Sequence, residues 1–252
     1  MTAQLGKTAG FDPLTPLLRP PTWRELVPRA SIWGMAELAR FRRDRTPLPS
    51  LVAVAADALL QDPTVVEELL AAGCSELFLD AHTLGAEGDR REAGLTALVE
   101  ALQAGGVRVF AGFTLGLDHD EVGCFERLVA WVEARRLCGV ELRLWVPEPG
   151  SEQFRVLARA DRIVHRQLRC WDGAHVVVTP ARMSSQVLYR GWVWAQQRLA
   201  SPGSIWRRRP LDPAVWPAFL LALLRFHRGR MWGARSTWAS LPSPGGSGVL
   251  PA

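Results

Sequence analysis

The chain has 252 residues, of which 48% are hydrophobic, and its formal net charge is +5. This is enough apolar material to build one large domain, or one domain with appendages. The most apolar run, residues 214–224, contains Pro217 and is shorter than the roughly 18 residues that a membrane span needs. The first residues show no signal pattern, so we predict a cytoplasmic protein without a membrane segment.

Four cysteines, Cys74, Cys124, Cys138 and Cys170, are scattered along the chain. None belongs to a Cys-x-x-Cys pair, and no histidine stands at zinc-finger spacing from one of them. We therefore predict no dedicated metal site. Each cysteine is expected to be a small buried hydrophobe or an inert thiol.

Charge is unevenly distributed. Residues 1–50 hold 8 basic and 4 acidic side chains, residues 51–150 hold 7 and 17, and residues 151–252 hold 15 and 4. A basic end can indicate a nucleic acid or another anionic partner. We favour the alternative, that the acidic middle and the basic end attract each other within one fold, because no nucleic-acid-binding module is recognisable.

The prolines among residues 1–21 predict an irregular segment. A helix, broken at Pro28, is expected over residues 22–43, and its side chains Trp33, Leu38 and Phe41 are expected to face a core. Strands and helices then alternate. The expected strands cover residues 51–56, 77–79, 107–115 and 140–146. The helices between them cover residues 63–72, 90–104 and 120–136. Such alternation with short turns predicts an α/β fold of parallel strands, either a partial (β/α) barrel or an open α/β sheet, and we favour the partial barrel.

The pattern changes after Gly150. The expected elements are a short helix at 151–160, a strand or extended segment at 174–179, and helices at 184–199 and 211–228. The predicted organisation is an irregular or helical segment at 1–48, the partial barrel at 49–180, a helical extension at 181–233 and a disordered tail at 234–252.

Phrases at the predicted strand ends, in order and at fitting spacing, carry a resemblance. They lie at residues 73–83, 113–125, 144–151, 161–180 and 183–205. Together they resemble the C-terminal part of radical S-adenosylmethionine (radical SAM) proteins, most closely the cobalamin-binding branch. The similarity covers roughly residues 50–209.

The resemblance implies a barrel in which three cysteines hold a four-iron cluster that binds and cleaves SAM. Here no cysteine precedes Leu51, no residues match the first two strands of that fold, and no cobalamin-binding half precedes them. Cluster iron needs thiolate ligands. We therefore expect no cofactor in the isolated chain, although SAM and a 4Fe-4S cluster belong to the family.

By position in that family, the expected cofactor-binding residues are Asp80, His82, Thr83, Gly116, Asp118 and Pro147. The strand-end glutamate that helps to hold SAM falls at His82, and the glycine two residues before it falls at Asp80. One interpretation is a polar cleft in which Asp80, His82 and the Asp118-His119-Asp120 group converge on a ligand. The other is ordinary loop polarity, with Asp118 or Asp120 capping the next helix.

Three other features have a functional and a structural interpretation. Pro147 shapes a loop over the substrate in the family, but Pro147 and Pro149 alone explain a rigid turn. His175 is expected to make a structural hydrogen bond, rather than to touch a ligand. Tryptophans and arginines between 192 and 209 suggest RNA stacking, or more simply an amphipathic helix with solvated arginines.

Three functions follow from these observations. The first hypothesis is a degenerate or truncated radical SAM-like protein. It would be catalytic only if a partner, such as a cluster-bearing radical SAM protein, supplied the iron–sulfur half. Alternatively, it is a cofactor-free pseudoenzyme that binds a partner or a small ligand. RNA binding is the distant third.

Overall fold

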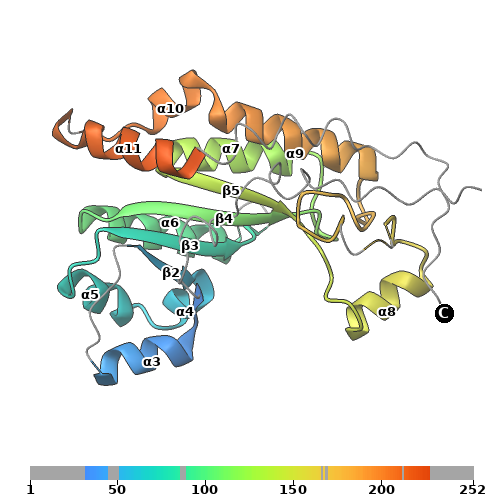
Figure 1. The fold of residues 1–252 in the computed structure, drawn as a ribbon, viewed down its shortest axis with the longest axis horizontal. Coiled ribbons are helices and arrows are strands. Elements are labelled where there is room, and N and C mark those ends of the chain that lie inside the picture. Colours follow the sequence, from blue (N-terminus) through green and yellow to red (C-terminus); the bar gives the residue numbers. More distant parts are fainter. Residues whose placement is uncertain are drawn as a thin grey trace, which may run out of the picture.

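A sheet of five parallel strands, in the order β1-β2-β3-β4-β5, organises the computed structural model (Figure 1). The structure describes residues 32–44, 51–85, 89–165, 167, 170–211 and 213–227. Spatial order equals chain order and the sheet is not closed, as expected for part of a barrel. The α/β fold predicted from the alternating pattern is therefore confirmed, with a helical C-terminal part.

The strands are β1 (Ile32–Trp33), β2 (Val52–Ala55), β3 (Glu76–His82), β4 (Arg108–Leu115) and β5 (Gly139–Leu144). The helices up to β5 are α3 (Met35–Asp44), α4 (Ala56–Gln61), α5 (Thr64–Ala71), α6 (Arg90–Ala104) and α7 (Cys124–Ala134). The later helices are α8 (Glu152–Arg159), α9 (Ser185–Ala200), α10 (Pro202–Arg208), the 3-10 turn η2 (Pro213–Val215) and α11 (Trp216–His227).

One face of the sheet carries the main core. Alternate residues of a strand point to opposite faces, so Leu77, Leu79 and Ala81 of β3 all point to the same side. They are fully buried there, against side chains from α3 to α7 and from α9. On α6, Leu95 and Leu102 are completely buried, and each such side chain contributes roughly 1.5–3 kcal/mol. The helix predicted for residues 90–104 is therefore confirmed.

The opposite face is covered by the last helix. Phe78 of β3 and Phe110 of β4 form a second cluster with Phe219 and Leu223 of α11. In Figure 1, α11 lies along the sheet near β5. In a closed (β/α) barrel this face would line the interior, whereas here a helix of the same chain packs against part of it.

The outer edge of β5 is closed by side chains and by one loop. Trp192 of α9 donates its indole N–H to the carbonyl of Leu142 (3.0 Å), and Arg208 of α10 donates to the carbonyl of Cys138 (3.3 Å). The backbone N–H of Leu144 is bonded to the carbonyl of Gly173 (2.7 Å). Edge strands expose such groups unless something covers them, and here they are satisfied within the chain.

Several predicted elements have the expected ends because short side chains cap them. Ser151 Oγ accepts from Phe154 N at 3.1 Å to begin α8, and Ser184 Oγ accepts from Val187 N at 3.3 Å to begin α9. These two starts agree with the predicted helices at 151–160 and 184–199. The helix expected from residue 63 begins at Thr64 instead, with Pro63 at the cap position, and Asp62 Oδ1 accepts from Thr64 N at 3.2 Å.

Other predictions were wrong. Residues 32–33, expected in a helix, form β1 beside β2, because β-sheet pairing overrides local helical periodicity. The helix expected from residue 120 begins at Cys124 instead. Residues 174–179, expected as a strand or an extended segment, form no strand and contribute a single antiparallel bridge, between Val178 and Ile163.

The short helices α4 and α10 were not predicted, and α11 begins at Trp216 rather than at residue 211. The predictions for residues 1–31 and 234–252 lie outside the described residues. None of the helices in the described ranges is long and apolar enough to cross a membrane.

The unequal charges are paired within the fold, as the favoured interpretation predicted. Asp118 forms an ion pair with Arg162, Glu121 with Arg182 at 2.6 Å, and Glu133 with Arg207 at 3.2 Å. Each pair joins the acidic middle of the chain to its basic end.

Candidate functional site at the carboxyl edge of the sheet

The site residues expected from the sequence follow β3, β4 and β5, where parallel strands present their carboxyl ends. The structure brings Asp80 together with Arg143, and Thr83 together with His119. It joins Asp118 to the segment after α8 rather than to the residues at the end of β3. The six predicted residues therefore belong to several separate contacts.

Asp80 forms an ion pair across the sheet. Its Oδ1 accepts from Nη2 of Arg143 on β5 at 2.5 Å, with both side chains largely buried. Gly112 on the intervening β4 makes room, because a Cβ there would lie 3.3 Å from Arg143 Nη2 and 2.9 Å from the Phe78 ring. Asp80 is thus neutralised by a neighbour that the sequence analysis did not single out.

Strand β3 ends at His82 with an irregular backbone, and Thr83 is the first residue of the loop that follows. His82 has a left-handed backbone (φ 58°), is exposed, and lies at a register shift in the β3–β4 pairing. Thr83 Oγ1 lies 3.4 Å from Nε2 of His119, which follows β4. His82 and His119 are two exposed imidazoles on neighbouring strand ends.

Asp118 fastens the segment after α8 to the end of β4. Both of its oxygens accept from the guanidinium of Arg162, one of them at 3.1 Å, and Oδ1 also accepts from Ala181 N at 3.2 Å. Its hydrogen bonds with Arg162 hold the pKa of the Asp118 carboxyl below its usual range. This double hydrogen bond is a structural clamp.

Asp120 organises the loop that precedes it. Its Oδ2 accepts from Gly116 N at 2.8 Å and from Leu117 N at 2.9 Å, and the side chain is only 6% exposed. The expectation that Asp118 or Asp120 caps the following helix is therefore wrong, because α7 begins at Cys124, after Gly123. Burial raises the pKa of Asp120 despite these two hydrogen bonds.

Gly116 and Pro147 have structural positions. Gly116 has a left-handed φ of 94°, and a Cβ there would lie 2.7 Å from the side chain of Leu188. Pro147 is buried in the loop after β5. Both positions suit a rigid loop.

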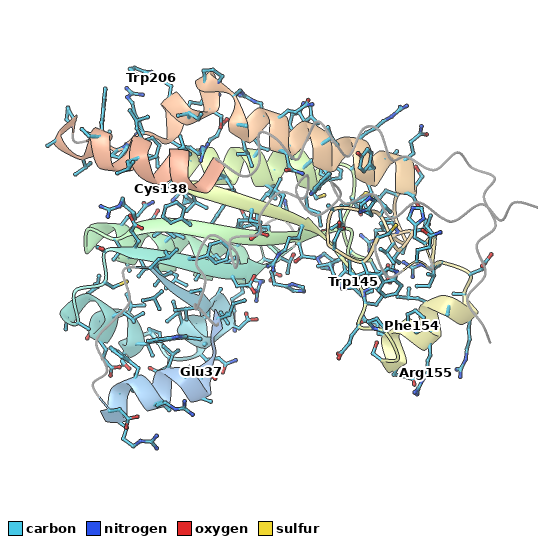
Figure 2. All side chains as sticks on the ribbon, viewed as in Figure 1. Glu37, Cys138, Trp145, Phe154, Arg155 and Trp206 are labelled. Carbon is cyan, nitrogen blue, oxygen red and sulfur yellow. The ribbon has the colours of Figure 1, made fainter. Side chains whose placement is uncertain are left out.

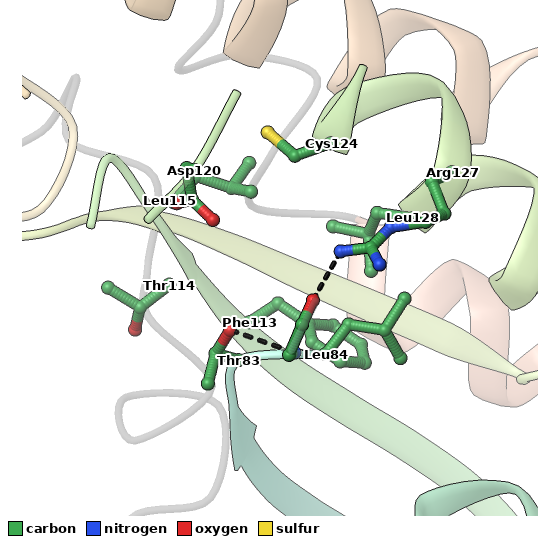
Figure 3. Close-up of a pocket in the computed structure, with 10 residues that line it drawn as sticks. Thr83, Leu84, Phe113, Thr114, Leu115, Asp120, Cys124, Arg127 and Leu128 are labelled. Carbon is green, nitrogen blue, oxygen red and sulfur yellow. Dashed lines mark hydrogen bonds between the residues drawn. The ribbon is translucent and has the colours of Figure 1, made fainter. Parts of the chain in front are cut away.

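Two further arginines hold the loop between β3 and α6. Arg91 of α6 donates to the carbonyls of Thr83 (2.9 Å) and Ala81 (2.7 Å), and Arg127 of α7 donates to the carbonyl of Gly85. The hollow that Arg127 lines with Asp120 and Cys124 has a volume of about 10 Å³, roughly one water molecule (Figure 3). Sequence reasoning missed these arginines, because helical arginines that point at loop carbonyls have no local signature.

A second polar cluster lies beyond β5. Asp172 Oδ1 accepts from Ala174 N at 2.8 Å and lies 3.0 Å from Nδ1 of His175. Burial opposes ionisation of Asp172, but the bonds from His175 and Ala174 outweigh it and lower its pKa. Burial and then the charge of His175 lower the pKa of His165. The structural role predicted for His175 agrees with this contact.

The four cysteines do not fit an iron–sulfur cluster. Cys74 and Cys138 precede β3 and β5, whereas Cys124 lies beyond the carboxyl end of β4, and these two edges are separated by strands roughly 20 Å long. Burial raises the pKa of Cys74, and it raises that of Cys124 and of Cys138 to about 12, so these thiols stay protonated. Among the described residues, no group of three or more His, Cys, Asp or Glu side chains is arranged to hold a metal ion.

The tryptophan and arginine cluster divides between the interior and the surface. Trp192 is buried, at 7% exposed, as the structural interpretation predicts. Arg208 is only 1% exposed, so the solvated arginines of that interpretation were wrong for this residue. Trp206, however, is 58% exposed on the outer side of α10, next to the exposed Arg207 (Figure 2).

Comparison with known proteins adds no family: no protein-family model matches the chain, and no curated protein matches it. The kinship with radical SAM proteins therefore stays a prediction. At the carboxyl edge, the three strand-end carboxylates are held by arginines or by backbone N–H groups, and exposed imidazoles remain for hydrogen bonding.

Proposed function

We propose that this chain is a cofactor-free pseudoenzyme, a binding protein built on part of a radical SAM-like barrel. The observation that carries the proposal is the engagement of the strand-end acids. Asp80 is paired with Arg143, Asp118 with Arg162, and Asp120 with two backbone N–H groups. A cofactor at this edge would have to displace these contacts, each of which stabilises the fold.

The chemistry of the thiols supports the same proposal. A four-iron cluster requires deprotonated cysteines that converge on one point. Cys74 and Cys138 lie at one end of the sheet and Cys124 at the other, and these three thiols are buried and protonated. The exposed His82 and His119 offer a ligand or partner hydrogen bonds without any cofactor.

Reconstitution tests this proposal. The full chain is incubated anaerobically with iron and sulfide, and a variant with all four cysteines changed to alanine is treated in parallel. We expect the same low iron content and featureless visible absorption for both proteins, and no heat of SAM binding in calorimetry. Four irons per chain that depend on the cysteines, or micromolar SAM affinity, would refute the proposal.

One observation favours a second candidate, in which the chain is half of a composite radical SAM enzyme. The sheet is open, and its edge strand β1 has only two residues. Strands of another polypeptide could extend the sheet at β1, whereas β5 is covered. SAM cleavage that appears only when this chain is mixed with a cluster-bearing radical SAM protein, such as one encoded by a neighbouring gene, would establish it.

A further inference from the structure

A second hollow lies at the opposite end of the sheet from the strand-end residues discussed above. It is formed by the turn between α7 and β5, the end of α10 and the start of α11, and its volume is about 90 Å³. This space holds several water molecules, and so a group the size of phosphate. The residues that line it are Arg136, Arg207, Arg209, Pro210, Leu211 and Trp216.

The arginines that line this hollow outnumber the described carboxylates that pair with them. Arg207 Nη1 contacts both oxygens of Glu133, at 3.2 and 3.3 Å, and Glu133 is also 3.6 Å from Arg198. Within the described ranges, Arg136 and Arg209 have no carboxylate partner. Among the residues that the structure describes, Glu133 is the carboxylate that pairs with a guanidinium of the lining, and the mutual repulsion of the three arginines favours the entry of an anion.

Arg209 is held in place before any ligand arrives. Its guanidinium carbon lies 3.9 Å from the ring centroid of Trp206 and 5.8 Å from that of Trp216, and its Nη1 donates to the Trp206 carbonyl at 2.7 Å. The two indoles meet edge to face at 5.7 Å, and Trp216 Nε1 donates to the carbonyl of Pro210 at 2.9 Å. A guanidinium ordered in this way loses little entropy when it binds an anion.

We propose that this hollow binds the terminal phosphate of a small phosphate monoester. A terminal phosphate carries nearly two charges and three acceptor oxygens, which suits several arginine forks converging on a small space. The exposed Trp206 stands beside it, so an aromatic remainder, as in a nucleoside monophosphate, has a ring to stack against. The proposal goes beyond the proposed function and holds whether or not the carboxyl edge is catalytic.

Calorimetry of the full chain tests the proposal at fixed ionic strength, with inorganic phosphate, a nucleoside 5′-monophosphate and the unphosphorylated nucleoside as probes. We expect both phosphates to bind at one site, the nucleotide more tightly, and the nucleoside not to bind. Arg209→Gln and Arg136→Gln should each weaken phosphate binding about tenfold or more. Trp206→Leu should remove the advantage of the nucleotide over phosphate.

The matched control is Arg190→Gln, which removes an equal charge from an exposed position on α9. Arg136 is an exposed turn residue, so its variant tests binding even if Arg209→Gln fails to fold. Absence of phosphate binding would overturn the proposal, and so would an equal loss in the Arg190 variant. Affinity for single-stranded RNA that grows with its length and exceeds that of the monoester would replace it with nucleic-acid binding.

Discussion

At the scale of single residues, Asp120 shows how one side chain can set the shape of a strand-end loop. Gly116 and Leu117 present two backbone N–H groups to the same carboxylate oxygen, in a place that water barely reaches. Buried donors cost free energy when they have no acceptor. The role of Asp120 is therefore to satisfy this backbone rather than to meet a ligand.

Two substitutions at this position separate the hydrogen bond from the charge. Asp120→Ala should lower the free energy of unfolding by about 2–4 kcal/mol, because it leaves two buried N–H groups without an acceptor. Asp120→Asn keeps an acceptor oxygen and should be nearly neutral. Urea denaturation followed by circular dichroism compares the two variants; equal losses would show that charge, not acceptance, is what matters.

The raised pKa of Asp120 also predicts a difference in how the stability of the native protein and of Asp120→Asn depends on pH. A carboxyl whose folded pKa lies above its unfolded value contributes stability at low pH, and this contribution is lost as pH rises through the folded pKa. In Asp120→Asn that part of the pH dependence should disappear, while the dependence that arises from Asp118 remains.

At the scale of elements, the contact between α7 and α9 depends on a missing side chain. A Cβ on Gly191 of α9 would collide with the ring of Phe125 on α7. The two helices can therefore approach closely only while residue 191 is glycine, and this approach positions Trp192 against β5.

Gly191→Ala should thus destabilise the protein by about 1–3 kcal/mol, although alanine is the better helix former. The control is Gly203→Ala on α10, where the nearest atom to a new Cβ is Arg207 Nη1 at 4.0 Å. That substitution should be neutral or slightly stabilising. Thermal unfolding distinguishes the two; a stabilised Gly191 variant would mean that the interface can open without cost.

The elements that sequence reasoning predicted best are those with long periodic patterns. Helix α6 has the predicted bounds, because leucines and valines repeat at helical spacing before Gly105. Strand β1 was missed, since two residues carry no periodic signal and its pairing with β2 is a tertiary contact. The candidate site was found only in outline, because Arg91, Arg143 and Arg162 come from distant elements that meet only in the folded chain.

At the scale of the whole molecule, ion pairs connect the acidic and basic parts of the chain. Asp118 holds Arg162 and Ala181, and so ties the end of the sheet to the segment between α8 and α9. The Asp118 side chain is 55% exposed, so solvent weakens the pair, and a double-mutant cycle should give a coupling of about 0.5–1 kcal/mol.

The ion pair between Asp118 and Arg162 should contribute less stability at acidic pH. Because Arg162 lowers the folded pKa of Asp118, the stability it provides is complete above the unfolded pKa, near 3.8, and is lost as pH falls through the folded value. The urea midpoint of the native protein should therefore fall more steeply below about pH 4 than that of Asp118→Asn. Identical profiles for the two proteins would contradict a stabilising role for the pair.

The side chains that bond to the outer edge of β5, the indole of Trp192 and the guanidinium of Arg208, also affect how copies of this chain can associate. A foreign strand approaching from that side meets carbonyls already occupied by Trp192 and Arg208. At this edge of the sheet, addition of a strand from another copy, as in amyloid or strand swapping, would first require α9 and α10 to detach. Helices α9 and α10 therefore protect the β5 edge from pairing with strands of other copies.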